Sequence, residues 1–146
     1  MKRFAVPALS LVLLALPACG TSTTKAVDTA GGQIVNVDMR ASHFQPASVT
    51  VDRGRRVTFR FTNRDQIVHD AFVGDEDAQK AHEKQMREAK KDGHAGHSMA
   101  EEGAITVKPG KVGELSYTFN KTGTTLIGCH EPGHYASGMV MQVNVR

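Results

Sequence analysis

The residues best suited to chemistry lie in one short stretch near the C-terminus. Within it Cys129, His134 and Met139 recur at intervals of five residues. Thiolate and imidazole are strong ligands for copper, whereas a thioether suits Cu(I) and serves as a weak axial ligand to either oxidation state. Pro132 and Gly133 predict a turn that folds His134 back toward Cys129. The stretch therefore predicts a metal site of mixed sulfur and nitrogen ligands, with copper as the favoured ion.

A trigonal site needs one more imidazole. The best candidate is His69, which lies in a strand-like run over residues 67–73 that a β-sandwich can bring beside the final loop. Three alternatives stay open from the residues alone: His130 could replace His134, His43 could contribute, and Met139 could fill the core instead of binding metal. Zinc held by the cysteine and nearby histidines is a further alternative, and the methionine argues against it.

The elements that must position these residues are strands. Apolar and polar residues alternate over 34–40, 57–62 and 139–145, as half-buried strands require, and shorter apolar runs occur near 49–51, 67–73, 105–107, 115–119 and 124–128. Turn residues such as Pro109 and Gly110 separate them. Seven to eight short strands predict an all-β, antiparallel Greek-key sandwich or barrel, assigned to residues 34–146.

Residues 75–103 interrupt this pattern with a polar insertion that has no Val, Ile, Leu, Phe or Tyr. Asp75 is a candidate helix N-cap, Glu76 with Lys80 and Glu83 with Arg87 have the spacing of i,i+4 ion pairs, and Gly93 is a natural stop. The insertion therefore predicts a polar helix of three to four turns. It also carries candidates for an accessory copper site, namely His82, Met86, His94, His97 and Met99. A solvated helix with incidental histidines explains the same residues.

The N-terminus has the features of an export signal. Lys2 and Arg3 precede an apolar run that continues to residue 16, and the sequence before Cys19 is similar to a bacterial lipoprotein cleavage box. We therefore expect residues 1–18 to be a signal peptide, Cys19 to be lipidated, and residues 19–33 to form a flexible tether. A disulfide between Cys19 and Cys129 is the alternative. The mature chain is expected to be anchored at the outer face of a bacterial membrane by lipid alone.

The charge of the chain gives little support for a nucleic-acid partner. The formal net charge of the 146-residue chain is +3, and loss of Lys2 and Arg3 with the leader lowers it to about +1. The remaining arginines near residues 53–64 make only a modest basic cluster, so nucleic-acid binding is not expected. One domain is too short for the several copper centres of a multicopper oxidase or nitrite reductase, so we expect no enzyme. We also expect a monomer.

Together, the Cys-x4-His-x4-Met loop, a distant upstream histidine and Phe44-x-Pro46 resemble the cupredoxins, the plastocyanin and azurin family of blue copper proteins. His69-Asp70 before Phe72, the polar His/Met insertion and the final loop are similar to small exported bacterial cupredoxins linked to copper tolerance. This resemblance implies that His69, Cys129, His134 and Met139 bind the copper. Asp70 departs from the family, where many members have Asn beside the copper thiolate.

Two functions follow as hypotheses. The resemblance implies one-electron transfer through a single copper that cycles between Cu(II) and Cu(I), with His134 as the electron's exit and a redox protein or copper-handling protein as partner. The His/Met insertion favours the alternative, in which the protein scavenges, buffers or delivers copper outside the cytoplasm.

Overall fold

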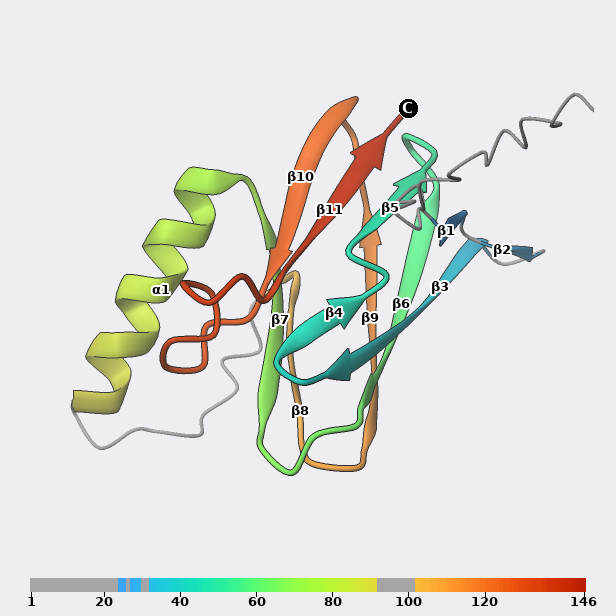
Figure 1. The fold of residues 1–146 in the computed structure, drawn as a ribbon. Helices are drawn as coiled ribbons and strands as arrows, with labels where there is room; N and C mark the ends of the chain where they lie inside the picture. The colour runs from blue at the N-terminus through green and yellow to red at the C-terminus, as the bar shows by residue number, and fades with distance from the viewer. Residues whose placement is uncertain (1–23, 26, 30–31, 92–101) are drawn as a thin grey trace, which may run out of the picture.

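The computed structural model describes residues 24–25, 27–29, 32–91 and 102–146, and these form two packed β-sheets with one helix beside them (Figure 1). The first sheet has the order β1 (Thr24–Lys25), β5 (Ser48–Val51), β11 (Val140–Val145), β10 (Gly123–Gly128), β7 (His69–Gly74) and β8 (Ala104–Val107). The second has the order β2 (Val27–Thr29), β3 (Gly32–Arg40), β6 (Arg56–Asn63) and β9 (Val112–Thr118), with β4 (His43–Gln45) paired to β3. The all-β sandwich expected from the sequence is therefore confirmed.

The core lies between the two sheets, where strands such as β6 and β11 contribute every second side chain. In β6, Val57, Phe59 and Phe61 are fully buried while the residues between them face outward. In β11, Met141 and Val143 are equally buried. This is the period-2 pattern that the sequence displayed, and burial of these apolar faces is what drives the two sheets together.

The expectation of a purely antiparallel arrangement is wrong for some strand pairs. β3 runs parallel to β6, and β5 runs parallel to β1 and β11. The reason is that β5 crosses to the opposite sheet before β6 returns beside β3, so β6 points the same way as β3. Local alternation reveals which face of a strand is buried, but it does not reveal which strand becomes its neighbour.

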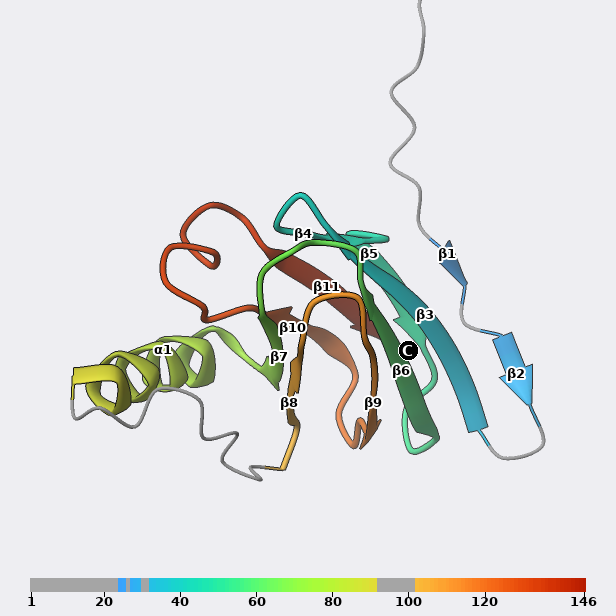
Figure 2. The same ribbon diagram turned by 90° about the horizontal axis from the view of Figure 1, so that it is seen from below.

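The polar insertion forms helix α1 (Glu76–Lys91), which lies outside the sandwich next to β7 and β10 (Figure 2). Asp75 Oδ1 accepts a hydrogen bond from the Ala78 N–H at 2.9 Å, so the predicted N-cap is confirmed. Lys80 Nζ lies 3.6 Å from Glu76 Oε1, as its spacing predicted. The helix is longer than the three to four turns expected, and Gly93, the predicted stop, lies outside the described residues.

Part of the segment expected to be a tether is paired with the sandwich. β2 pairs with β3, and β1 pairs with β5. The expected signal peptide and Cys19 lie outside the described residues. Among the residues that are described, no helix has both the length and the apolar character needed to span a membrane.

Candidate metal centre

Three neighbouring strands of the first sheet bring the candidate ligands to the same end of the sandwich. His69 is the first residue of β7, and Cys129 directly follows the last residue of β10. Because β10 is antiparallel to both β7 and β11, Gly128 lies opposite Phe72 on one side and Val140 on the other. The start of β7, the end of β10 and the loop that leads into β11 therefore meet there.

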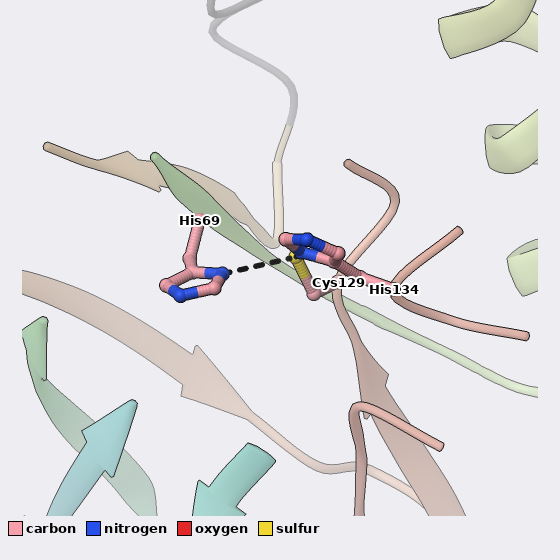
Figure 3. A group of neighbouring side chains, drawn as sticks. All are labelled: His69, Cys129 and His134. Carbon is pink, nitrogen blue, oxygen red and sulfur yellow. Dashed lines mark hydrogen bonds between the residues drawn. The ribbon is translucent and has the colours of Figure 1, made fainter. Parts of the chain in front are cut away.

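The side chains of His69, Cys129 and His134 converge at this point (Figure 3). Their ligand atoms all lie within 4.8 Å of one another. Cys129 Sγ is 3.4 Å from Nδ1 of His134 and 3.8 Å from Nδ1 of His69. His69 and Cys129 are fully buried, whereas His134 is partly exposed. One thiol and two imidazoles directed at one another form the donor set that copper prefers, so the residues fit a copper ion.

The loop between Cys129 and Met139 is held by its own backbone. The His134 N–H donates to the Glu131 carbonyl at 2.9 Å, closing a turn in which Gly133 has a φ of 82°. That left-handed conformation favours glycine. The Met139 N–H donates to the His134 carbonyl at 3.0 Å, and the Cys129 N–H donates to the Met139 carbonyl at 3.1 Å. The predicted turn therefore places His134 beside Cys129.

Met139 is fully buried, and both its backbone N–H and its carbonyl form hydrogen bonds within the loop. Its burial is compatible both with packing and with binding copper, so its role as axial ligand stays a prediction.

His130, the alternative to His134, points elsewhere: its Nε2 donates to Gln79 Oε1 at 2.7 Å. The ring of His43 is bonded to the Ala41 carbonyl and its residue is exposed, so it does not join the cluster.

Asp65 is a site residue that sequence reasoning missed. Its Oδ2 accepts a hydrogen bond from His69 Nε2 at 2.9 Å, on the side of the ring opposite the nitrogen that faces Cys129. The same carboxylate accepts the N–H groups of Ala41 and Ser42 at 2.8 and 2.9 Å. A carboxylate behind a ligand histidine fixes the tautomer of the ring and raises its basicity. Asp65 therefore orients His69 so that Nδ1 is free to bind metal.

The electrostatics of Asp65 agree with this role. Burial alone would raise the pKa of its carboxyl, but the N–H groups of Ser42 and Ala41, together with His69, hold the pKa below the ordinary value. The carboxylate is thus anionic at neutral pH. The one sequence signal for it is the i,i+4 spacing from His69, which carries little weight outside a helix.

Asp70, expected to act behind the ligands, is buried next to Cys129. Its Oδ1 accepts the His130 N–H at 2.6 Å, and its Oδ2 lies 3.9 Å from Nε2 of His82. Burial would raise the pKa of the Asp70 carboxyl, but hydrogen bonds from His82, Cys129 and the His130 backbone lower it overall. An anionic carboxylate therefore lies close to the thiol of Cys129.

The accessory candidates are only partly described. His82 is buried in α1, where its ring stacks on Phe72 with centroids 4.0 Å apart and interplanar angle 8°. It therefore points into the protein, toward Asp70. Met86 lies one turn further along α1 and is half-buried. His94, His97 and Met99 lie outside the described residues.

Residues 32–146 match the model of the copper binding proteins of the plastocyanin/azurin family. The chain belongs to this family. A copper-resistant cuproprotein, CopI, from Rubrivivax gelatinosus is 38% identical over 103 residues, which cover 70% of this chain and 59% of that protein. The chain thus spans less than two thirds of that relative. CopI from Pseudomonas aeruginosa is 29% identical over 90% of this chain and 87% of its own length.

Solved structures of similar fold include two auracyanins. Reduced auracyanin from Roseiflexus castenholzii superposes with a TM-score of 0.67 at 21% identity, covering 77% of this chain and 96% of that one. Auracyanin B gives the same TM-score and identity over 83% of this chain and 94% of its own. The expected resemblance to the cupredoxins, and to relatives named for copper resistance, is confirmed.

In this cupredoxin, burial shifts the pKa values of Cys129 and His134 in opposite directions in the metal-free protein. Burial, followed by the charge of Asp70, raises the pKa of the Cys129 thiol, so the metal-free protein holds a neutral thiol. Burial, followed by the charge of His69, lowers the pKa of His134, which keeps that imidazole neutral and ready to bind. A copper ion held by both residues would therefore displace a proton from Cys129 and none from His134 at neutral pH.

Proposed function

We propose that this cupredoxin is an exported one-electron carrier that contributes to copper tolerance. The observation that carries the proposal is the convergence of His69, Cys129 and His134, whose ligand atoms lie within 4.8 Å of one another in a largely buried site. A bound copper supplies the Cu(II)/Cu(I) couple. Because the fold already gathers the ligands, their rearrangement on electron gain or loss is small. Met139 is the proposed axial ligand.

The proposed route for the electron is His134. His69 and Cys129 are fully buried, whereas His134 is partly exposed. The neighbouring Pro132, Gly133 and Ala136 are exposed as well and carry no charge. A redox partner, or a copper-handling protein, can approach the site closely at this surface. We propose a monomer that acts without catalysing a reaction of its own.

A second candidate function is copper scavenging, buffering or delivery. It is favoured by the names of the relatives, which are copper-resistant cuproproteins, and by the histidines and methionines of residues 75–103. In this function His94, His97 and Met99, with Met86, supply an accessory site, whereas His82 is buried toward Asp70. Imidazole accepts both oxidation states and thioether favours Cu(I), so such a site can capture copper in either form.

The proposed location is the outer face of a bacterial membrane. Lys2, Arg3 and the apolar run that follows support export, and Cys19 supports a lipid anchor. An anchor of this kind confines the protein near membrane-bound partners without a membrane-spanning helix.

The two functions require different amounts of protein for a given copper load, and this difference provides the test. A copper-sensitive bacterial strain is supplied with the protein at graded levels, and copper tolerance is measured against the number of copper sites. A carrier turns over, so tolerance saturates at protein levels far below the copper load. A scavenger protects in proportion to its abundance, and tolerance that rises linearly with abundance would contradict the electron-transfer proposal.

Matched variants assign the effect to a site. Cys129→Ser removes the cupredoxin centre and leaves the insertion intact, whereas joint replacement of His94, His97 and Met99 by alanine does the reverse. The carrier proposal predicts loss of tolerance only in the first variant. Loss only in the second would support copper capture.

A further inference from the structure

Helix α1 is attached to the metal centre through a fully buried glutamine. Gln79 is completely inaccessible although the helix around it is strongly polar. Its Nε2 lies 3.0 Å from the Phe72 carbonyl, 3.3 Å from that of Gly74 and 3.2 Å from that of Leu126. These carbonyls belong to β7 and β10, the two strands that deliver His69 and Cys129. Gln79 therefore ties the helix to both ligand-bearing strands.

The other end of the same amide reaches the ligand loop. Because the NH₂ group faces carbonyl oxygens, Oε1 must face His130, and it lies 2.7 Å from His130 Nε2. That nitrogen must carry the proton, since Oε1 can only accept. Gln79 thus fixes the tautomer and the position of the residue next to Cys129.

The packing at Gly128 shows how closely α1 approaches the copper-binding strand. A Cβ atom at this position would lie 2.5 Å from Gln79 Oε1 and 2.7 Å from the ring of Tyr135. Any side chain would therefore displace the glutamine, the tyrosine or the strand. The glycine directly before Cys129 is thus required for the helix to reach His130.

From His130 the connections continue to the ligand sulfur. The His130 N–H donates to Asp70, whose carboxylate lies beside Cys129. His82, one turn after Gln79 on α1, approaches Asp70 at 3.9 Å. Near the end of the helix, Lys90 Nζ forms an ion pair with Glu131 at 2.9 Å. Gln79, His82 and Lys90 therefore connect α1 to residues around Cys129.

We propose that Gln79 is a positioning residue of the copper centre, acting through His130 to fix the backbone at Cys129 and thereby the copper–thiolate geometry. The proposal rests on copper binding by His69, Cys129 and His134, and it is independent of whether the centre carries electrons. It assigns α1 a structural part in the cupredoxin site, separate from any accessory metal binding by the insertion. Deletion of residues 75–103 would consequently alter the centre itself.

The test compares Gln79→Met with Gln85→Met in the full chain. Methionine has a similar length, cannot donate to the three carbonyls and is only a weak acceptor for His130 Nε2. Gln85 lies exposed on the same helix. Both variants are loaded with one equivalent of Cu(II), and their optical and paramagnetic-resonance spectra, copper affinity and reduction potential are measured. We expect Gln79→Met to weaken copper affinity by about 10-fold and to change the thiolate band. Gln85→Met should match the parent protein.

A second variant keeps the test decisive if Gln79→Met fails to fold. His130→Phe retains a ring against Tyr135, which stacks on His130 with centroids 4.8 Å apart, but cannot donate to Gln79. We expect the same spectral change. In the metal-free protein, amide hydrogen exchange at Cys129 and His130 should also become faster in this variant. A folded Gln79→Met or His130→Phe protein with the parent's spectrum, potential and affinity would overturn the proposal.

Discussion

Replacing Asp65 by asparagine should raise the reduction potential of the bound copper. Asp65 Oδ2 lies 2.9 Å from His69 Nε2, so a single imidazole ring separates the carboxylate from the nitrogen that faces Cys129. The negative charge stabilises Cu(II) more than Cu(I). Asp65→Asn removes that charge while an amide oxygen can still accept the hydrogen bond from His69.

The magnitude follows from this geometry. A unit charge about 7 Å from the ion changes the energy of an added electron by about 2 kcal/mol at an effective dielectric constant of about 20. The Asp65 side chain is 19% exposed, so screening reduces the effect. A net change of about 1 to 2 kcal/mol corresponds to about 40 to 90 mV for a one-electron couple.

Spectroelectrochemical titration measures this shift directly. The control is Asp77→Asn, which removes the same charge from a side chain of α1 that is 97% exposed. Circular dichroism checks that both variants are folded, because Asp65 also accepts the N–H groups of Ala41 and Ser42. A potential that falls, or that rises no more than in Asp77→Asn, would refute the assignment of Asp65 to the copper centre.

The remaining predictions concern the ligands, pH and the anchor. Cys129→Ser should abolish the intense thiolate-to-copper absorption while circular dichroism shows an intact fold; a variant that stays coloured would exclude Cys129 as ligand. Met139→Leu should keep the colour and shift the potential, and an unchanged potential would remove the methionine from the axial position. Burial lowers the pKa of His130 and His134, so the unfolded chain binds more protons than the fold below about pH 6.5. The free energy of unfolding of the metal-free protein should therefore fall from pH 7 toward pH 5 in denaturant titrations, and pH-independent stability over this range would contradict the shifts. Cys19→Ala should release the protein from membrane fractions; a variant that stays bound would exclude the lipid anchor.

The sequence was most informative where the relevant residues are close together in the chain. Cys129 and His134 lie in one loop whose turn depends on local backbone chemistry, so spacing alone predicted their approach. His69 required a further step, because only a sandwich brings β7 beside β10. The strands could also be predicted from residues close together in the chain, because alternating apolar residues indicate which face of a strand is buried.

The residues behind the ligands could not be found in this way. Asp65 is held by the N–H groups of Ala41 and Ser42, more than twenty residues earlier in the chain, and a sequence does not show that contact. Gln79 lies in a charged helix where a polar side chain is expected to face solvent. The parallel pairing of β3 with β6 likewise depends on which sheet the intervening strands join. Each of these depends on tertiary arrangement.

X-ray absorption at the copper edge of the full chain, loaded with one equivalent of Cu(II), identifies the atoms that bind the metal. We predict one short copper–sulfur contact and two imidazole nitrogens around each copper, from Cys129, His69 and His134. A copper surrounded by nitrogen and oxygen alone would contradict this prediction.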